Sequence, residues 1–428
     1  MSELYRKISA AVDRRRDDII GLVQELVRIP TFTPPGHNYD TAVEALVPKL
    51  TSIGFEVQRI DMPDEVFQQR CRVHYPEMNG VRANLLAKKD FGKPERVLWY
   101  AHVDTVPVPD ADKWTRDPFG AQVVGDRMYG RGTADAKGEC CAAIAAFQIL
   151  HELGIEPRYN VTIALTGDEE IGPYSGLMYL ADEGHFADCS YFHSLDGSGD
   201  GVIVAHNGAL TWRIDIKGVS THTGRAYSGI NPIEHSLAIL EEFRALQTEV
   251  LSRRSDFPIP PNIAADTGVD KLQPTFNVTM AHGGVKHTIV PPTFVLQGDR
   301  RFLPEEPEED VIAEIRAAFE RAKAKDPLLD AEIAFRPFYM SHAGDPNHPW
   351  AKEVHRIVEA VVGEPRPITA SGGSSDVAYC SHVTGIPVVG FGIGRYKESM
   401  NHGIDENIRI GDLLDLVKIT AAVATGAL

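Results

Sequence analysis

The sequence predicts an α/β protein in which a mostly parallel sheet, flanked by helices, is interrupted by a smaller α+β domain. Short apolar segments alternate with helical segments over residues 1–208, and this alternation is typical of a parallel sheet with helices on both faces. Over residues 209–340 the order changes to strand, helix, strand, strand, helix, strand, which is the order of a ferredoxin-like module. From residue 341 the chain returns to apolar strand and helix patterns.

The first part of the chain begins with two helices and continues with alternating strands and helices. Apolar residues recur at helical spacing over residues 4–28, and Pro30 ends this helix. A second helix is expected over residues 41–54, where Gly54 ends it. Strands are then expected at residues 55–61, 84–87, 96–101 and 160–166, with a helix at residues 136–153.

The inserted segment and the end of the chain have their own patterns. The insert is expected to have strands at residues 209–217, 274–282, 293–302 and 333–338 and helices at residues 231–251 and 306–325. A strand at residues 387–392 and a helix at residues 410–424 follow. Because 428 residues exceed what one core usually supports, we expect a larger domain in two parts, 1–208 and 341–428, and an inserted domain, 209–340.

Composition excludes several classes of partner. A formal net charge of −17 argues against binding to nucleic acid or to an anionic membrane surface, because phosphate-binding faces are rich in Lys and Arg. The first thirty residues have no apolar core of a signal peptide, and there is no apolar run of about 18 residues. The five cysteines form no CxxC pair, a pattern that suits a reducing compartment. We therefore expect a cytoplasmic protein without a membrane partner.

Residue types that bind divalent metals occur where these strands and helices begin or end. His102 and Asp104 stand at the end of an expected strand, two residues apart and thus on the same side. Asp135 follows a glycine turn and opens an Ala-rich helix, and the pair Glu169-Glu170 follows another apolar strand. Open α/β sheets place their chemistry at these positions. The side chains together form a mixed nitrogen and oxygen ligand set for a divalent metal.

Each of these residues also has an ordinary structural interpretation. Asp135 could be a helix N-cap, and the glutamate pair could form a solvated acidic turn. Asp196, before Gly197, could cap a turn, and His402 could be a surface histidine. Their joint occurrence in these sequence settings favours a metal-dependent hydrolase over the separate structural interpretations.

Taken together, the motifs resemble a known family. They are His102-Val103-Asp104, GRGTADAKG at residues 130–138, GDEEIG at residues 167–172, Asp196, GVSTH at residues 218–222, GGSSD at residues 372–376 and NHGIDE at residues 401–406. This set resembles the aminoacylase, carboxypeptidase G and succinyl-diaminopimelate desuccinylase family of co-catalytic metallopeptidases, and the resemblance covers nearly the whole chain. It implies that the larger domain is catalytic and that the insert is a lid and dimerisation domain.

The resemblance implies two divalent metal ions. Asp135 would bridge them. His102 and Asp196 would complete one site, and Glu170 and His402 would complete the other. Zinc suits this ligand set best, and manganese or cobalt also fits.

The resemblance also implies roles for four other side chains. Glu169 would be the general base, and Asp104 would orient His102. His222 would stabilise the oxyanion, often from the partner subunit of a homodimer. Arg301 would bind a carboxylate of a small-molecule substrate.

The implied reaction is hydrolysis of an amide or peptide bond in a small carboxylate-bearing substrate, such as a dipeptide or an N-acyl amino acid. A metal-bridging hydroxide would attack the scissile carbon, and Glu169 would take the proton and return it to the leaving nitrogen. Asp196, where relatives often have Glu, favours the peptide-cleaving branches.

Two alternatives remain open from the sequence. Thr288, where relatives often have Asn, leaves room for an aminohydrolase that releases the amine of an amino-aromatic acid at the same dinuclear site. A non-catalytic, metal-free binding protein on the same fold is the third interpretation, and the intact ligand set speaks against it.

Overall fold

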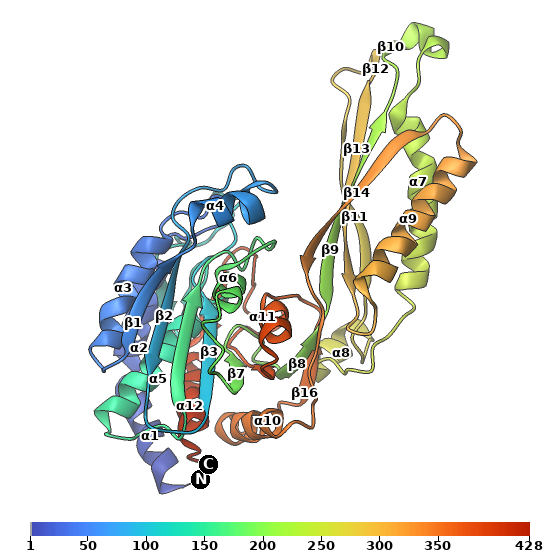
Figure 1. Ribbon diagram of the computed structural model, residues 1–428. Helices are drawn as coiled ribbons and strands as arrows, with labels where there is room; N and C mark the ends of the chain where they lie inside the picture. Colours follow the sequence, from blue (N-terminus) through green and yellow to red (C-terminus); the bar gives the residue numbers. More distant parts are fainter. Residues whose placement is uncertain (1) are drawn as a thin grey trace.

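The chain forms two lobes (Figure 1), described by a computed structural model that covers residues 2–428 apart from the side chain of Pro337. The larger lobe is built around a nine-stranded sheet, and the smaller, elongated lobe around a four-stranded sheet. The strands of the smaller sheet all lie between residues 208 and 339. The chain therefore leaves the larger sheet after β8 (Val202–His206) and re-enters it at β15 (His342–Ala343).

The larger sheet has parallel strands at its centre. Its order is β1 (Glu56–Asp61), β2 (Ala83–Lys89), β6 (Asn160–Thr166), β3 (Arg96–His102), β7 (Tyr191–Ser194), β17 (Val388–Gly390), β8 and β15, and β16 (Ile368–Ser371) also pairs with β8. The pairs β6–β3, β3–β7 and β7–β17 are parallel, whereas β1, β2 and β15 run antiparallel to their neighbours. Every residue of β3 is buried, as expected for a central strand covered on both faces. The predicted α/β fold is confirmed.

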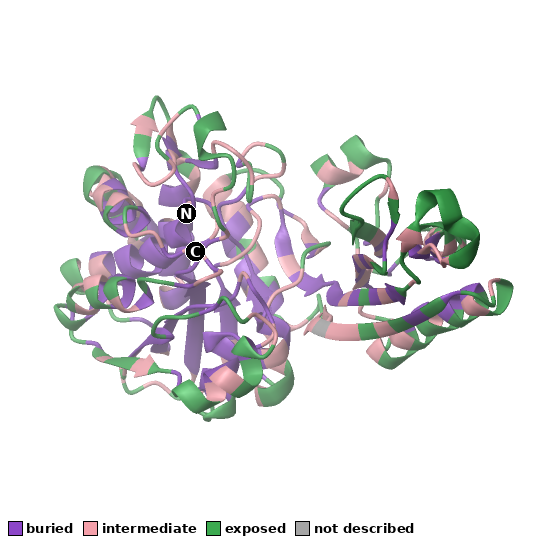
Figure 2. Ribbon diagram, turned by 90° about the horizontal axis from the view of Figure 1, so that it is seen from above, coloured by how far each residue is buried: buried purple, intermediate pink, exposed green. Residues whose placement is uncertain are grey.

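Helices cover both faces of the larger sheet. One face packs against α1 (Glu3–Arg14), α2 (Arg16–Val27), α3 (Tyr39–Thr51), α5 (Lys137–Glu152), α10 (Pro349–Val362) and α12 (Ile410–Thr425). The other face packs against α4 (Asp64–Phe67), η1 (Gln68–Arg72), α6 (Gly176–Asp182) and α11 (Val377–Thr384). Buried residues accordingly concentrate in this lobe (Figure 2).

The expected single helix over residues 4–28 is two helices in the structure. The break lies at Arg15, whose φ of −91° and ψ of 11° leave the helical region. Arg15 instead donates hydrogen bonds to Asp18 and, across the lobe, to Glu152 of α5 at 2.6 Å. The break lets α1 pack on α12 while α2 packs on α5. Tertiary packing thus overrides the helical periodicity.

The smaller lobe has the expected ferredoxin-like topology. Its elements are β9 (Gly208–Lys217), α7 (Pro232–Val250), β11 (Thr275–Gly283), β13 (Thr293–Phe302), α9 (Glu308–Lys325) and β14 (Asp330–Tyr339). The sheet order is β11-β13-β9-β14, and all its pairs are antiparallel. Trp212 and Phe243 pack edge to face at 5.0 Å in its core. Figure 1 shows β10 (Thr221–His222) and β12 (Ile289–Val290) at the tip farthest from the larger lobe.

Two smaller features connect these elements. A three-stranded sheet of β4 (Gln122–Val124), β5 (Arg127–Tyr129) and β18 (Asn407–Arg409) joins the segment before α5 to the segment before α12. Helix α8 (Pro261–Thr267) lies between the lobes (Figure 1). Among the described residues, no helix has the length and apolar character needed to cross a membrane.

Candidate metal centre

The expected ligands come together at the carboxyl ends of the central strands. His102 is the last residue of β3, Glu170 lies four residues after β6, and Asp196 lies two residues after β7. Because β6, β3 and β7 are parallel neighbours, their carboxyl ends share one edge of the sheet. Asp135 comes from the turn before α5, and His402 from the loop between β17 and β18.

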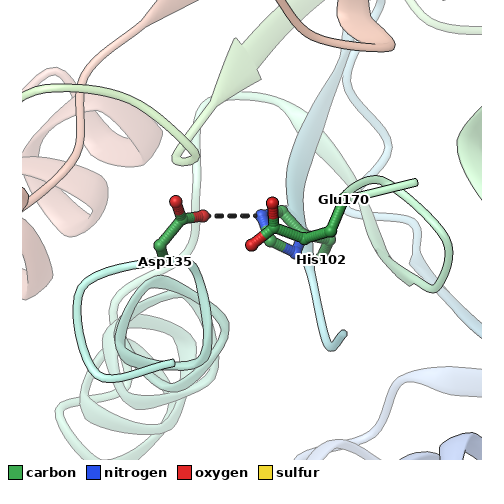
Figure 3. Close-up of side chains that lie close together, drawn as sticks. All are labelled: His102, Asp135 and Glu170. Carbon is green, nitrogen blue, oxygen red and sulfur yellow. Dashed lines mark hydrogen bonds and ion pairs between the residues drawn. The ribbon is translucent and has the colours of Figure 1, made fainter. Parts of the chain in front are cut away.

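The carboxylate of Asp135 lies between two imidazoles. Its Oδ1 is 3.0 Å from His102 Nε2, and its Oδ2 is 3.1 Å from His402 Nε2. His402 Nε2 also lies 3.0 Å from Glu170 Oε2. Ligand atoms of His102, Asp135 and Glu170 all lie within 4.8 Å of one another (Figure 3). Asp135 is therefore placed to face two cations at once, one beside each histidine.

Backbone geometry sets these positions. Gly132, in the turn before Asp135, has φ of 86°, and a Cβ there would lie 2.6 Å from Thr105 Cγ2, so the turn requires glycine. His402 itself has φ of 61°, in the left-handed region that non-glycine residues rarely adopt. Such conformations persist where the surrounding structure holds them, commonly at functional sites.

The carboxylates outnumber the nearby basic groups. Burial and, to a smaller extent, the charge of Asp135 together raise the pKa of Glu170 to about 7. Burial likewise raises the pKa of Asp196 to about 6. Glu170 Oε1 is buried and has no hydrogen-bond partner among residues 2–428. Because buried charges are normally paired or coordinate metals, this set of nitrogen and oxygen donors fits divalent cations.

The two histidines respond to the carboxylates around them. Burial opposes a positive charge on His402, but its hydrogen bonds to Asp135 and Glu170 outweigh that effect and raise its pKa to about 11. For His102, burial is likewise outweighed by Asp104 and Asp135, which raise its pKa well above the usual value. Each imidazole therefore lies in a strongly negative field, which also attracts a cation.

Asp104 holds two parts of the centre in place. Its Oδ1 lies 3.4 Å from His102 Nδ1, and its backbone oxygen lies 3.1 Å from the same nitrogen. The carboxylate also accepts hydrogen bonds from the backbone amides of Glu169, at 3.3 Å, and Glu170, at 3.0 Å. Asp104 is thus placed to orient His102, and it also positions the Glu169-Glu170 turn, a contact that sequence reasoning missed.

Glu169 faces the same cavity as the ligands. The cavity has a volume of about 610 Å³, and Asp135, Glu169, Glu170, Asp196 and His402 are in its wall. Burial raises the pKa of Glu169 well above its ordinary value, against the influence of His102. A carboxyl group with a raised pKa beside the ligands is suited to accept and return a proton near neutral pH.

The two expected residues of the smaller lobe occupy different places. Arg301 Nη1 donates to Ser374 Oγ at 3.0 Å, and Ser374 lines the cavity. Arg301 Nε also pairs with Asp299 at 3.2 Å. His222 lies in β10 at the far tip, is exposed, and accepts a hydrogen bond from Gly224 N. The fold of one chain therefore does not bring His222 to the ligands.

Sequence reasoning also missed a buried carboxylate behind Asp196. Asp376 accepts hydrogen bonds from Tyr100 at 2.8 Å and from Ser175 at 2.5 Å. Ser375 Oγ lies 3.5 Å from Asp196 Oδ2 and 3.3 Å from Asp376 Oδ1. The only signal in the sequence was the GGSSD segment, to which we had assigned no role.

Comparison with known proteins identifies the family. The model of peptidase family M20/M25/M40 matches residues 98–426. The chain belongs to this family. A succinyl-diaminopimelate desuccinylase of Rhodospirillum centenum is 28% identical over 416 residues, which are 95% of this chain and 96% of that protein. This M20 chain is accordingly a hydrolase of carbon–nitrogen bonds of the amide type.

Solved structures share the fold of this M20 chain. The dipeptidase Dug1p of Saccharomyces cerevisiae has a TM-score of 0.81 at 16% identity, covering 99% of this chain and 98% of that one. The YxeP protein of Bacillus subtilis, described as a dinuclear metal-binding peptidase of the same family, has a TM-score of 0.65 at 16% identity, covering 96% and 98%.

Proposed function

We propose that this M20 hydrolase cleaves an amide or peptide bond in a small carboxylate-bearing substrate, of the dipeptide or N-acyl amino acid type. The observation that carries the proposal is the placement of the Asp135 carboxylate between the imidazoles of His102 and His402, with Glu169 in the wall of the same cavity. This arrangement supports two-metal hydrolysis of a C–N bond.

The ligand set divides into two halves around Asp135. His102 and Asp196 would hold one divalent ion, and Glu170 and His402 the other. When bound, such ions would supply an activated water and polarise the scissile carbonyl. Zinc suits these donors best, although manganese and cobalt accept the same donors.

The protein's own residues move the proton. Glu169 takes it from the attacking water and returns it to the leaving nitrogen. The carboxylate of Asp104 accepts hydrogen bonds from the backbone amides of Glu169 and Glu170, so the base and the neighbouring ligand keep a fixed relative position. Burial of Glu169 keeps its pKa raised, which makes both proton transfers accessible near neutral pH.

Arg301 would bind a carboxylate of the substrate. Its guanidinium reaches the cavity wall through Ser374, and an arginine binds a carboxylate with two parallel hydrogen bonds. The name of one relative, succinyl-diaminopimelate desuccinylase, agrees with a small substrate of this kind. The Asp299 contact would then hold the Arg301 side chain toward the cavity.

We also propose that residues 209–340 act as a lid and as the contact of a homodimer. The edge strand β11 exposes Val278 and Met280, and the tip exposes Tyr227 and Val285, at 88% and 91%. Apolar surface of this kind favours a partner. A second chain seated there could deliver His222 to the cavity, where its imidazole would stabilise the oxyanion. We place the protein in the cytoplasm, where its five free thiols would stay reduced.

A metal-dependent substrate screen tests the proposal. The protein is stripped of metal, reloaded separately with zinc, manganese or cobalt, and assayed against dipeptides, N-acyl amino acids, N-succinyl compounds and amino-aromatic acids. We expect amide hydrolysis that depends on the added metal and is lost in Glu169→Gln. Release of an aromatic amine without amide cleavage would support the aminohydrolase instead.

A further inference from the structure

A second cavity adjoins the candidate metal centre. It has a volume of about 250 Å³, and it shares Ser198, Ile203, Ile263 and Ser371 with the wall of the 610 Å³ cavity. The two spaces are therefore separated by one layer of side chains at most. The smaller cavity is therefore a direct neighbour of the space that would hold the substrate.

The surface of the smaller cavity is mainly apolar, although the uncharged polar residues Ser198, Thr267, Gln273, Thr275 and Ser371 also line it. Its apolar members include Ile203, Ile259, Ile263, Val269, Leu272 and Ala370. The charged residue among its described lining residues is Lys271, whose Nζ lies 3.7 Å from Asp256, a residue that is itself exposed. The ammonium group is thus directed to solvent, and the stem of the side chain covers the cavity. Such a wall favours an apolar occupant.

The wall has a defined structure, because the segment that forms it is hydrogen-bonded to the larger lobe. We call residues 255–272, which include α8, the α8 arm. Within the arm, Leu272 N donates to Phe257 O at 2.9 Å, and Ala370 N, in β16 of the larger sheet, donates to Pro258 O at 2.8 Å. The arm is therefore attached to the larger sheet at its base.

The end of the α8 arm that is farther from β16 contacts the loop that carries His402. Asp266 accepts hydrogen bonds from the Tyr396 hydroxyl at 2.9 Å and from Lys397 Nζ at 2.5 Å. Tyr396 and Lys397 both line the larger cavity. The arm thus bridges from β16 to the rim of the candidate metal centre and forms one side of the smaller cavity.

We propose that the smaller cavity is a subsite for an apolar side chain or acyl chain of the substrate that is cleaved at the metal centre. The inference rests on the proposed function and adds the chemical class of one substrate group. Each methylene buried there should tighten binding about fourfold, since burial of a CH₂ group is worth about 0.8 kcal/mol. The gain should stop when the chain fills the cavity.

Binding of linear carboxylates tests the subsite without turnover. Acetate, propanoate, butanoate, pentanoate and hexanoate are titrated by calorimetry into the zinc-loaded protein. We expect the dissociation constant to fall about fourfold per methylene, and Val269→Trp, which fills the cavity, to remove this dependence. The matched control Val124→Trp, on the exposed strand β4 of the larger lobe and in the wall of neither cavity, should retain it. If Val269→Trp fails to fold, Ile259→Ala, which enlarges the cavity, should extend the gain to longer chains.

A dissociation constant independent of chain length in the wild-type protein would overturn the subsite, as would an unchanged dependence in Val269→Trp. Two series of substrates extend the chain-length comparison to turnover. In one series the apolar chain is lengthened on the acyl side of the amide, and in the other it is lengthened on the amine side. A chain-length effect on binding without amide hydrolysis would refute the proposed function alone. Hydrolysis without any chain-length effect would refute the subsite alone.

Discussion

Arg131 and Glu406 form a buried ion pair in which Nη1 lies 2.6 Å from Oε2 and each side chain is only 1% exposed. Arg131 Nη2 also donates to the backbone oxygen of Gly403 at 3.1 Å, directly after His402. The guanidinium therefore connects the ion pair to the loop that carries one expected ligand.

The other half of the pair holds the second ligand loop. Glu406 Oε1 accepts hydrogen bonds from the backbone amides of Gly132, at 2.9 Å, and Ala134, at 3.0 Å. Asp135 follows Ala134. The pair thus fixes the distance between the Asp135 turn and the His402 loop, and both residues are positioning residues for the centre.

Glu406→Gln should weaken metal binding as well as stability. Removal of one partner of a buried ion pair costs about 3–5 kcal/mol, and loss of a group that orients metal ligands typically costs about 10- to 100-fold in metal affinity. Chelator competition measures the affinity, and urea unfolding the stability. Arg300→Met, which breaks a buried pair with Glu306 in the smaller lobe, should lower stability and leave metal affinity unchanged. Equal metal affinity in both variants would contradict the positioning role.

Glu169→Gln should separate catalysis from metal binding. If Glu169 moves the proton and is not a ligand, kcat should fall by roughly 10²–10⁴ while metal content stays near the wild-type value. Glu170→Gln, which removes the carboxylate 3.0 Å from His402, should lose metal. Metal analysis by mass spectrometry alongside kinetics checks both, and equal metal loss in the two variants would refute the assignment.

Mixed dimers should reveal whether His222 acts across subunits. Because His222 lies at the exposed tip, remote from its own cavity, the inactive variants His222→Ala and Glu169→Gln should recover part of the activity when their subunits exchange. In each mixed dimer, one of the two sites would then combine an intact base with an intact histidine. Subunit exchange is verified by mass spectrometry, and an inactive mixture after exchange would exclude a role for His222 in trans.

Arg301→Ala should mainly raise KM. A hydrogen bond to a charged group is worth about 1.5–3 kcal/mol, so KM should rise roughly 10- to 150-fold. Conversion of the substrate carboxylate to an amide should raise the KM of the wild type by a similar factor and change the KM of the variant little. Arg213→Ala, which removes an exposed arginine of the same sheet, is the matched control. Equal turnover of acid and amide by the wild type would rule out carboxylate recognition.

His193 should make the protein less stable in acid. Burial lowers the pKa of His193 to about 3, and neither ring nitrogen has a hydrogen-bond partner within the described part of the chain. Below about pH 6.5, His193 becomes protonated in the unfolded chain but stays neutral in the folded chain. The free energy of unfolding therefore falls as the pH falls. The free energy of unfolding at pH 5 should be lower than at pH 7 by roughly 2 kcal/mol.

Urea unfolding between pH 7 and pH 5 measures this dependence. His193→Leu should have a shallower pH slope than the wild type, whatever its stability at pH 7. The exposed His282→Gln should keep the wild-type slope. An identical slope in His193→Leu would show that other groups cause the acid sensitivity.

The local patterns of the sequence were sufficient for the element order and for the ligand candidates. Strands β6 and β3 are mainly apolar segments, His102 ends β3, and Glu170 lies four residues after β6, so chain order alone brings these two side chains to one sheet edge. The alternation in residues 208–339 likewise determined the ferredoxin-like order, because side-chain periodicity depends only on neighbours along the chain.

Tertiary structure decided the relations between segments that are distant in sequence. The break at Arg15 follows from packing on α5 and α12, which no local pattern contains. The support of the Asp135 turn by Glu406 joins Ala134 and Glu406, which are 272 positions apart. The adjoining cavity depends on how the α8 arm packs on β16 and on the loop before His402. Contacts of this kind arise from close packing of the whole chain. Residue types and spacing therefore identify the candidate ligands but not the distant residues that hold them in position.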